Sequence, residues 1–215
     1  HGLETIFIHP PEWRFEKNKK NIINAIRKYK INFPVIIDKD KKIIKKLKLN
    51  FWPTQILIGD NKIIYKHVGE GNYKKVERSI IKFLKIKSKR IFNKEPRYSK
   101  FPTIYCGKRK KGKVINPKNK LKFGILHKKG NWIQKDEYLQ NVAGKGYLTI
   151  TTRSKIINFV AKSINKRTIK VAIELNKKLI KKMNINKPQL YNILKLKNSK
   201  QNKITLITQS GLAIY

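Results

Sequence analysis

Cysteine is almost absent from this chain of 215 residues, in which Cys106 is the single thiol. One thiol excludes a fold stapled by internal disulfides. It also excludes a complete site for thiol–disulfide exchange, because attack on a disulfide and release of the product need two cysteines. Ligand-spaced groups are missing too, since the four histidines lie far apart without a suitable Cys, Asp or Glu nearby. We therefore expect no metal and no cofactor.

Acidic residues are also scarce: 12 Asp and Glu stand against 53 Lys and Arg, for a formal net charge of +41. Such a charge attracts polyanions and anionic lipid surfaces. The lysines are nevertheless spread along almost every segment together with many Ile and Asn, the residues that an A+T-rich genome overproduces. No nucleic-acid-binding module is recognisable. A basic nucleic-acid-binding protein is therefore kept as a second alternative, and nucleic acid is not the favoured partner.

Long apolar runs are absent as well. No stretch approaches the roughly 18 apolar residues of a membrane-spanning helix, and the first residues show no basic leader followed by an apolar stretch. Both ends fall inside strand-like patterns, Leu3 to Ile8 and Leu212 to Tyr215. We therefore expect this chain to be cut from a longer protein at both ends.

The first half alternates short apolar strands with amphipathic helices. The pattern predicts a strand at 5–8 that ends at Pro10 and Pro11, and then a helix with Ile22, Ile26 and Tyr29 on one face. A second strand is expected at 33–37. It is followed by Asp38-Lys39-Asp40, where an Asp can cap a helix, and then by a short helix carrying Ile43, Ile44 and Leu47. This order is typical of an α/β domain.

Pro53 marks the start of the next strand. A proline is tolerated there because the hydrogen-bond ladder has not yet begun. Strands at 55–58 and 62–68 flank Gly59-Asp60-Asn61, a composition that favours a hairpin. The hairpin ends at Gly69-Glu70-Gly71. A last helix is then expected to bury Tyr73, Val76, Ile80, Phe83 and Leu84 and to complete the unit near residue 86.

Four features of this half together resemble one family. They are the order of elements, the Trp52-Pro53 junction, the hairpin ending in Gly69-Glu70-Gly71, and the stretch His9-x-Pro11-Glu12-x-x-Phe15-Glu16. The resemblance is to the thioredoxin-like domain of the TlpA and DipZ type and covers residues 1 to about 86. These proteins are thiol–disulfide oxidoreductases of cytochrome c biogenesis that work outside the cytoplasm. Some carry a membrane electron-transfer domain.

The resemblance implies where the chemistry should lie. The Cys-x-x-Cys motif of the family would fall upstream of His1, so the domain here is partial and lacks its N-terminal elements. No catalytic residue is expected in this chain, which should be inactive alone. Pro53 matches the family's cis-proline, and with Trp52 and Thr54 it is expected to line a groove for an extended substrate.

Glu12 and Glu16 are candidates for tuning the dithiol, because a carboxylate near a thiol shifts where that thiol ionises. The alternative is that they only cap a helix, where an acidic residue in the first turn is favourable. Trp13 and Phe15 are expected to pack in the core and not to form a platform for substrate.

In the second half the apolar residues recur with a period of 2, which is typical of strands, and no longer with the helical period of 3.6. Residues 87–103 predict a basic linker with Pro96 and Pro102. Beyond it, Ile169 to Leu175 alternates apolar and polar residues as a half-buried strand does. Similar runs lie at 146–152, 156–161, 191–196 and 203–208. Short strands at this spacing predict an all-β sandwich, jelly-roll-like, over 104–215.

This half also resembles a known domain. Tyr105-x-Gly107, Gly130-Asn131-Trp132, Glu137-Tyr138 and Gly211-x-Ala213-x-Tyr215 are similar to the carbohydrate-binding-module-like domain that follows the thioredoxin unit in DipZ-type proteins. A sugar could stack on Trp132 and Tyr138, but an aromatic pair on alternating strands is more often core. Sandwich architecture alone does not imply a ligand. Cys106 is expected to be a buried apolar residue.

The sequence thus predicts a partial extracytoplasmic thiol–disulfide oxidoreductase, anchored in a membrane when complete. Its expected partners are protein thiols and disulfides, and a membrane electron-transfer domain. The alternative is a redox-inactive, thioredoxin-like binding or scaffold protein that keeps the proline-lined groove.

Overall fold

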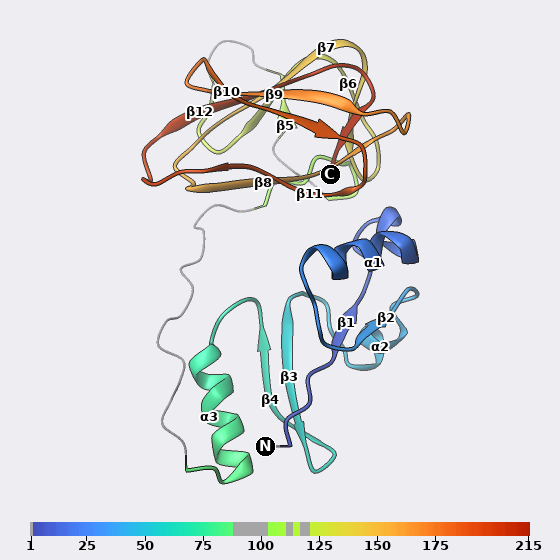
Figure 1. Ribbon diagram of the computed structural model, residues 1–215, viewed down its shortest axis with the longest axis vertical. Coiled ribbons are helices and arrows are strands. Elements are labelled where there is room, and N and C mark those ends of the chain that lie inside the picture. The colour runs from blue at the N-terminus through green and yellow to red at the C-terminus, as the bar shows by residue number, and fades with distance from the viewer. Residues whose placement is uncertain (1, 88–102, 111–113, 117–120) are drawn as a thin grey trace. The chain divides into compact units, whose positions relative to one another are not determined.

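The computed structural model describes residues 2–87, 103–110, 114–116 and 121–215 (Figure 1). Contacts group the chain into two units, His1–Glu12 with Asn32–Tyr98, and Trp13–Ile31 with Ser99–Tyr215. The predicted linker at 87–103 lies almost wholly outside the described residues. The predicted domain boundaries stay a prediction. The contacts place Trp13–Ile31 with the second unit. We call this stretch the crossover segment, because it connects the first two strands of the chain.

The first unit contains two short sheets. Strands β1 (Phe7–His9) and β2 (Val35–Ile37) pair in parallel, and β3 (Thr54–Gly59) and β4 (Lys62–Val68) form an antiparallel hairpin. The sequence predicted a partial α/β domain of the thioredoxin type here, and among the described residues its strands form two separate pairs that do not clearly make such a domain. No described strand lies between the two pairs, so the backbone hydrogen bonds that would join them into one sheet are not made.

Local signals placed the turns of this unit well. The two central residues of the β3–β4 turn, Asp60 and Asn61, both have positive φ, as a two-residue hairpin requires. Asp38 caps α2 (Lys42–Lys46), because its carboxylate accepts the backbone N–H groups of Ile43 at 3.2 Å and of Ile44 at 3.0 Å. Both features agree with the sequence predictions.

Helix α3 (Tyr73–Leu84) has the predicted extent but not the predicted burial. None of its residues is fully buried, and Phe83 is exposed although its ring lies against Gly59 of β3. The only neighbours that α3 contacts extensively among the described elements are β3 and β4. A single hairpin offers too little surface to cover an amphipathic helix.

The crossover segment contains the 3₁₀ helix η1 (Arg14–Lys17) and the helix α1 (Lys19–Lys28). Asn18 caps α1, since its side chain accepts the backbone N–H of Lys20 at 2.9 Å. Ile22 is the buried residue of α1, on the apolar face that the sequence predicted.

The rest of the second unit is a large β-sheet. Within the described residues it has nine strands, and seven of them follow the order β10-β9-β12-β7-β13-β8-β11, while β6 pairs with β7 and β5 with β6. The sheet curls over on itself (Figure 1). Its strands are β5 (Val114–Ile115), β6 (Leu126–Gln134), β7 (Leu139–Thr152), β8 (Ile156–Ser163), β9 (Ile169–Leu175), β10 (Lys178–Ile185), β11 (Gln189–Lys195), β12 (Asn202–Thr208) and β13 (Leu212–Ile214).

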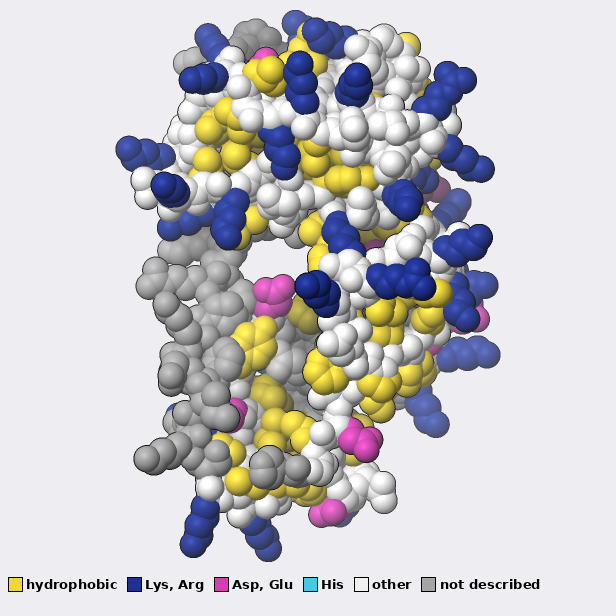
Figure 2. Space-filling model, viewed as in Figure 1, with side chains coloured by type: hydrophobic (Ala, Val, Ile, Leu, Met, Phe, Trp, Pro, Cys, Tyr) yellow, Lys and Arg dark blue, Asp and Glu magenta, His cyan; other side chains and the backbone are white. Residues whose placement is uncertain are grey.

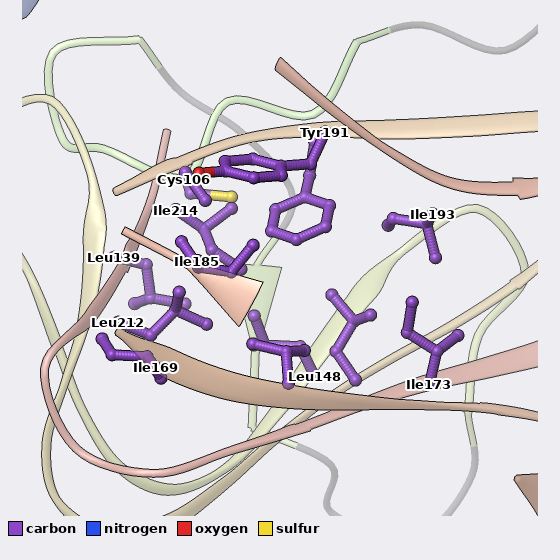
Figure 3. Packing of buried hydrophobic residues seen from close by; sticks show 14 of the residues in the cluster. Cys106, Leu139, Leu148, Ile169, Ile173, Ile185, Tyr191, Ile193, Leu212 and Ile214 are labelled. Atoms are coloured by element: carbon purple, nitrogen blue, oxygen red, sulfur yellow. The ribbon is translucent and has the colours of Figure 1, made fainter. Parts of the chain in front are cut away.

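One apolar core fills the interior of this curled sheet (Figure 3). In β9 the buried residues alternate as Ile169, Val171 and Ile173, as the period-2 pattern predicted. Burial of this cluster removes much apolar surface from water, which is the main stabilising contribution to the unit. The sandwich-like part of the fold prediction is therefore supported, and the described chain is mostly β.

Basic side chains are scattered over the face shown in Figure 2, without gathering over one element. Apolar side chains lie between them. This distribution agrees with the dispersed lysines of the sequence. It gives no specific support to a groove or platform for nucleic acid.

Candidate functional site

The candidate substrate groove lies at the start of β3. The Trp52–Pro53 peptide bond is cis, as the resemblance led us to expect. The carbonyl oxygen of Pro53 accepts the N–H of Gly69 at 2.8 Å, which continues the pairing of β3 with β4 by one step. The Thr54 hydroxyl donates to the carbonyl of Phe51, which closes the turn before the strand.

Apolar rings are exposed beside this turn. Phe51 is 70% exposed and Trp52 40% exposed. The Nζ of Lys41 lies 5.2 Å from the centre of the Trp52 ring, in reach of a cation–π interaction. An exposed indole with an apolar face and one N–H donor is a common anchor for a bound peptide.

Strand β3 has an open edge next to these rings. Among the described strands it pairs with β4 alone. Its other edge therefore offers backbone N–H and C=O groups to an added strand. A peptide in extended conformation can bind such an edge through its main chain, with side-chain pockets setting the specificity.

The turn after β4 supports the geometry at Pro53. Gly69 and Gly71 both have positive φ, which glycine adopts at little cost. The Gln55 side chain donates to the Gly71 carbonyl at 3.2 Å and ties this turn to β3. These contacts explain the glycines of the Gly69-Glu70-Gly71 stretch.

The two candidate carboxylates have different surroundings. The Glu16 carboxylate accepts the backbone N–H of Trp13 at 3.1 Å, so it caps η1. This contact agrees with the alternative that Glu16 only caps a helix. Glu12 is half-buried and belongs to the first unit, whereas Glu16 belongs to the second. A role of either residue near a dithiol stays a prediction. No cluster of three or more metal-ligating side chains is present in the described part of the chain.

Cys106 is not a nucleophile in this structure. It is 2% exposed and lies in the apolar cluster with Tyr191 and Ile214 (Figure 3). Burial raises the pKa of its thiol to about 12, because the apolar surroundings penalise the thiolate. Since the thiolate is the reactive form, this residue supplies no thiol chemistry.

The aromatic pair of the sandwich is largely internal. Trp132 is buried, and its Nε1 donates to the carbonyl of Lys129 at 3.0 Å. Tyr138 is half-buried, with its ring centre 5.3 Å from that of Tyr215. The predicted core role of Trp132 is confirmed. A flat, open pair of rings for a sugar is not formed by these two residues.

A group of charged and aromatic side chains surrounds Glu137. Several of its members belong to the motifs quoted above for the second half, but the sequence did not predict that they lie together. We call this group the Glu137 cluster. It comprises Trp13, Tyr105, Arg109, Glu137, Tyr138, Lys162 and Tyr215.

Two groups of the Glu137 cluster, Tyr215 and Lys162, have shifted pKa values, mainly because they are buried. Burial, and secondarily the Glu137 carboxylate, raise the pKa of Tyr215. Burial lowers the pKa of Lys162, and the nearby Glu137 carboxylate partly offsets this effect. The Lys162 Nζ also lies 4.9 Å from the Tyr138 ring centre. The Glu137 cluster is therefore a desolvated environment in which the Glu137 carboxylate favours the charged form of Lys162 and the neutral form of Tyr215.

Replacing Gly107 by alanine should strongly destabilise the second unit. A Cβ there would lie 2.4 Å from the Asp136 carbonyl oxygen and 2.4 Å from the Glu137 carbonyl carbon. That backbone is held by hydrogen bonds from Lys108 and Arg109, so it cannot easily retreat. We expect a loss of about 2–3 kcal/mol in the free energy of unfolding, measured by urea denaturation.

The control for this variant is Gly144→Ala. Gly144 has a left-handed backbone, with φ of +59°, but no atom lies within 4 Å of a Cβ placed there. We expect a loss of about 1 kcal/mol from the left-handed backbone alone. Equal losses in the two variants would contradict the close approach at Gly107.

Comparisons with known proteins give partial matches. Over 76 residues, 35% of this chain, the sequence is 32% identical to NHL repeat-containing protein 2 of Bos taurus. Over 127 residues, 54% of this chain, it is 27% identical to protein DipZ of Mycobacterium tuberculosis (strain CDC 1551 / Oshkosh). Over 74 residues, 34% of this chain, it is 32% identical to SUPPRESSOR OF QUENCHING 1, chloroplastic, of Arabidopsis thaliana. No protein-family model matches.

The chain spans a small part of each of these relatives: 10% of the NHL repeat-containing protein, 18% of DipZ and 7% of the Arabidopsis protein. The match to DipZ supports the thioredoxin-like relation that the motifs of the first half indicate. A finer family assignment is not shown by these matches.

Similarity to solved structures is low. A family two carbohydrate esterase from Cellvibrio japonicus aligns with 41% of this chain and 30% of its own, at 11% identity and a TM-score of 0.35. A two-domain esterase active on acetylated mannans aligns with 97% of this chain and 61% of its own, at 12% identity and a TM-score of 0.29. Scores at this level do not establish a shared fold. Among the described helices, none has the length and apolar content needed to cross a bilayer.

Proposed function

We propose that this chain is part of an extracytoplasmic thiol–disulfide oxidoreductase of the TlpA/DipZ type, and that Trp52, Pro53 and Thr54 line the groove that holds its extended substrate. The observation that carries this proposal is the open edge of β3, which begins at Pro53 beside the exposed ring of Trp52. A main-chain edge next to an aromatic anchor fits an unfolded or extended polypeptide. The similarity to DipZ is in keeping with this class.

The dithiol of this enzyme is expected upstream of residue 1. The chain has only Cys106, which is buried and has a strongly raised pKa. Thiolate attack and resolution need two accessible cysteines. The proposal also includes a membrane anchor and a membrane electron-transfer partner in the full-length protein, both from the resemblance to the DipZ type.

The open edges of the first unit suit such a completion. Strands β1 and β3 each have one partner among the described strands, and apolar residues around them are exposed, among them Ile6, Phe7 and Ile58. Two separate strand pairs form a weak structure in water. A further strand paired with β1 would extend its sheet and cover Ile6 and Phe7, and it would leave the open edge of β3 to the substrate.

A first experiment reads the coding sequence before His1 and expresses the longer chain. A Cys-x-x-Cys in that sequence, together with reduction of insulin disulfides by the longer protein, is expected. Residues 1–215 alone should show no such activity. A reading frame without paired cysteines would contradict the enzymatic proposal.

A second experiment tests the groove in the longer protein. We expect Trp52→Ala to lower kcat/KM for a peptide disulfide about tenfold, because an exposed aromatic anchor at an interface contributes on this order. Ile156→Ala, which truncates another exposed apolar side chain in β8, is the control and should leave kcat/KM unchanged. Equal values for Trp52→Ala and wild type would remove Trp52 from the groove.

The alternative is a redox-inactive binding or scaffold protein. It is favoured by one specific observation, the single buried cysteine of this chain. Such a protein would keep the edge of β3 and the Trp52 ring for binding extended peptides, without exchange chemistry. The upstream sequence distinguishes it from the enzyme.

A further inference from the structure

The chain that connects β1 to β2 is unusual in its packing. Parallel strands need a crossover, and its helix normally packs on the sheet that it connects. Here the crossover carries η1 and α1, yet Trp13–Ile31 groups with the sandwich and not with β1 and β2. The element that joins the two strands is therefore held by another part of the protein.

The first attachment is polar and buried. Glu137 is 5% exposed, and its Oε2 accepts the backbone N–H of Arg14 at 3.1 Å. Its Oε1 lies 3.2 Å from Nη1 of Arg109, which forms an ion pair with it. This oxygen has no aligned hydrogen-bond donor among the described residues, so the contact is mainly electrostatic. A buried carboxylate needs such partners to remain charged.

Aromatic packing surrounds that attachment. Trp13 is buried, with its ring centre 5.2 Å from Tyr215 and 5.9 Å from Tyr105. The Phe15 ring lies 5.0 Å from Tyr215 in an edge-to-face arrangement. Ring pairs at these distances add to the stabilisation that burial provides.

A second attachment lies at the other end of the crossover segment. The Nζ of Lys28 donates to the Gln189 side chain at 2.8 Å and to the Leu190 carbonyl at 2.9 Å. Because Lys28 is the last residue of α1, its hydrogen bonds hold the C-terminal end of the helix, whereas the bond from Arg14 to Glu137 holds the chain before the helix begins. The crossover segment is thus fixed to the sandwich at two places.

The strand pair that it connects has little support of its own. β1 and β2 are each three residues long, and Phe7 and Ile36 are exposed. Short strand pairs depend on what holds their ends. The free energy that keeps β1 and β2 in register must therefore come in part from the segment between them.

We propose that the sandwich acts as an internal anchor for the β1–β2 crossover. The site consists of the members of the Glu137 cluster that lie beyond residue 103, and its occupant is the tripeptide Trp13-Arg14-Phe15 of the same chain, which supplies the remaining member, Trp13. Binding of this tripeptide holds the crossover segment in place and couples the order of β1 and β2 to the sandwich. This role is distinct from sugar binding, and it does not depend on the proposed redox function.

The test is hydrogen–deuterium exchange of the whole chain with the paired variants Arg14→Pro and Arg14→Ala. Both remove the Arg14 side chain, but only proline also removes the N–H that Glu137 accepts. Proline is tolerated at the first position of a helix, and Trp13 before it is already extended, as a residue preceding proline must be. The pair therefore isolates one hydrogen bond.

In Arg14→Pro we expect exchange to rise roughly tenfold in the amides of the crossover segment, since a hydrogen bond to a buried charge contributes on that scale. The amides of β2, at Val35–Ile37, should rise with them. Amides of β9 and β12 should stay protected in both variants. Arg14→Ala loses only the 4.0 Å ion pair between Nε of this exposed side chain and Glu137, a contact that contributes little, so it should stay close to the wild type. Unchanged exchange in β2 together with faster exchange in the crossover segment would overturn the coupling between the two. Unchanged exchange in the crossover segment would overturn the anchor.

If Arg14→Pro loses protection throughout the sandwich, Glu137→Gln is compared with Asp136→Asn. The two variants remove one negative charge at adjacent positions, but Asp136 is exposed and Glu137 is buried. Faster exchange of the crossover segment and of β2 in Glu137→Gln alone supports the proposal. Equal exchange in the two variants contradicts it.

Discussion

Replacing Ile173 by alanine is expected to lower the free energy of unfolding of the sandwich by about 2–5 kcal/mol. Ile173 is 0% exposed and lies in β9, which pairs with β10 on one side and β12 on the other. A side chain in the middle of a paired strand leaves a cavity that its neighbours cannot easily fill, because the ladder holds their backbones. Urea denaturation followed by near-ultraviolet circular dichroism measures the loss.

The matched control is Leu179→Ala on the neighbouring strand β10. Leu179 is 49% exposed, so its truncation removes little buried surface and should cost less than about 1 kcal/mol. Similar losses for the two variants would mean that the interior of the curled sheet is not the closely packed core seen in Figure 3.

Cys106 is expected to react with a thiol reagent at least about a thousandfold more slowly in the folded chain than in the unfolded chain at pH 8. Its pKa rises from 9.0 to about 12 on folding, which lowers the thiolate fraction by about three orders of magnitude. Burial slows the reaction further. The release of thionitrobenzoate from Ellman's reagent reports this site alone, since the chain has a single cysteine.

The control is the same chain in denaturing urea, where the thiol should react at the rate of a free cysteine. Rapid labelling of the folded chain would show that Cys106 is accessible, and it would contradict the buried role. Protection of this thiol should also follow sandwich stability, so Ile173→Ala should label faster wherever opening of the core exposes the thiol.

The same pKa shift predicts the direction of an alkaline effect. The folded pKa is raised, so the unfolded chain loses its proton first as the pH rises. The stability that the protonated thiol contributes is fully present below about pH 9 and is lost as the pH rises from 9 towards 12. The raised pKa of Tyr215 acts in the same direction. A Cys106→Ala variant should therefore lose less stability over this range than the wild type.

Periodicity predicted individual elements well where one face of a strand or helix is buried. The bounds of β4, α3 and β9 follow directly from apolar spacing and turn residues. Strands β5, β6 and β10 and the first part of β7 were not predicted. Register shifts within β6, and lysines on the largely exposed strand β10, break the alternation that a period-2 pattern needs.

The candidate groove and the Glu137 cluster differ in how they could be found. Trp52, Pro53 and Thr54 are neighbours in sequence, so one turn signal was enough to single them out. Glu137 receives its contacts from Arg14 and Arg109, and the rings around it include the last residue, Tyr215. No local pattern links positions so far apart.

The order of apolar, turn and capping residues was enough to predict most helices and strands. It also predicted that Cys106 is buried. The pairing of those elements depended on long-range contacts: which strands joined one sheet, and which part of the chain held the β1–β2 crossover. Such contacts are set by burial and by charge partners that meet only after the chain has folded. For this reason the crossover segment, which the sequence assigned to one domain, packs against the other through a buried carboxylate, four aromatic rings and the side chain of Lys28.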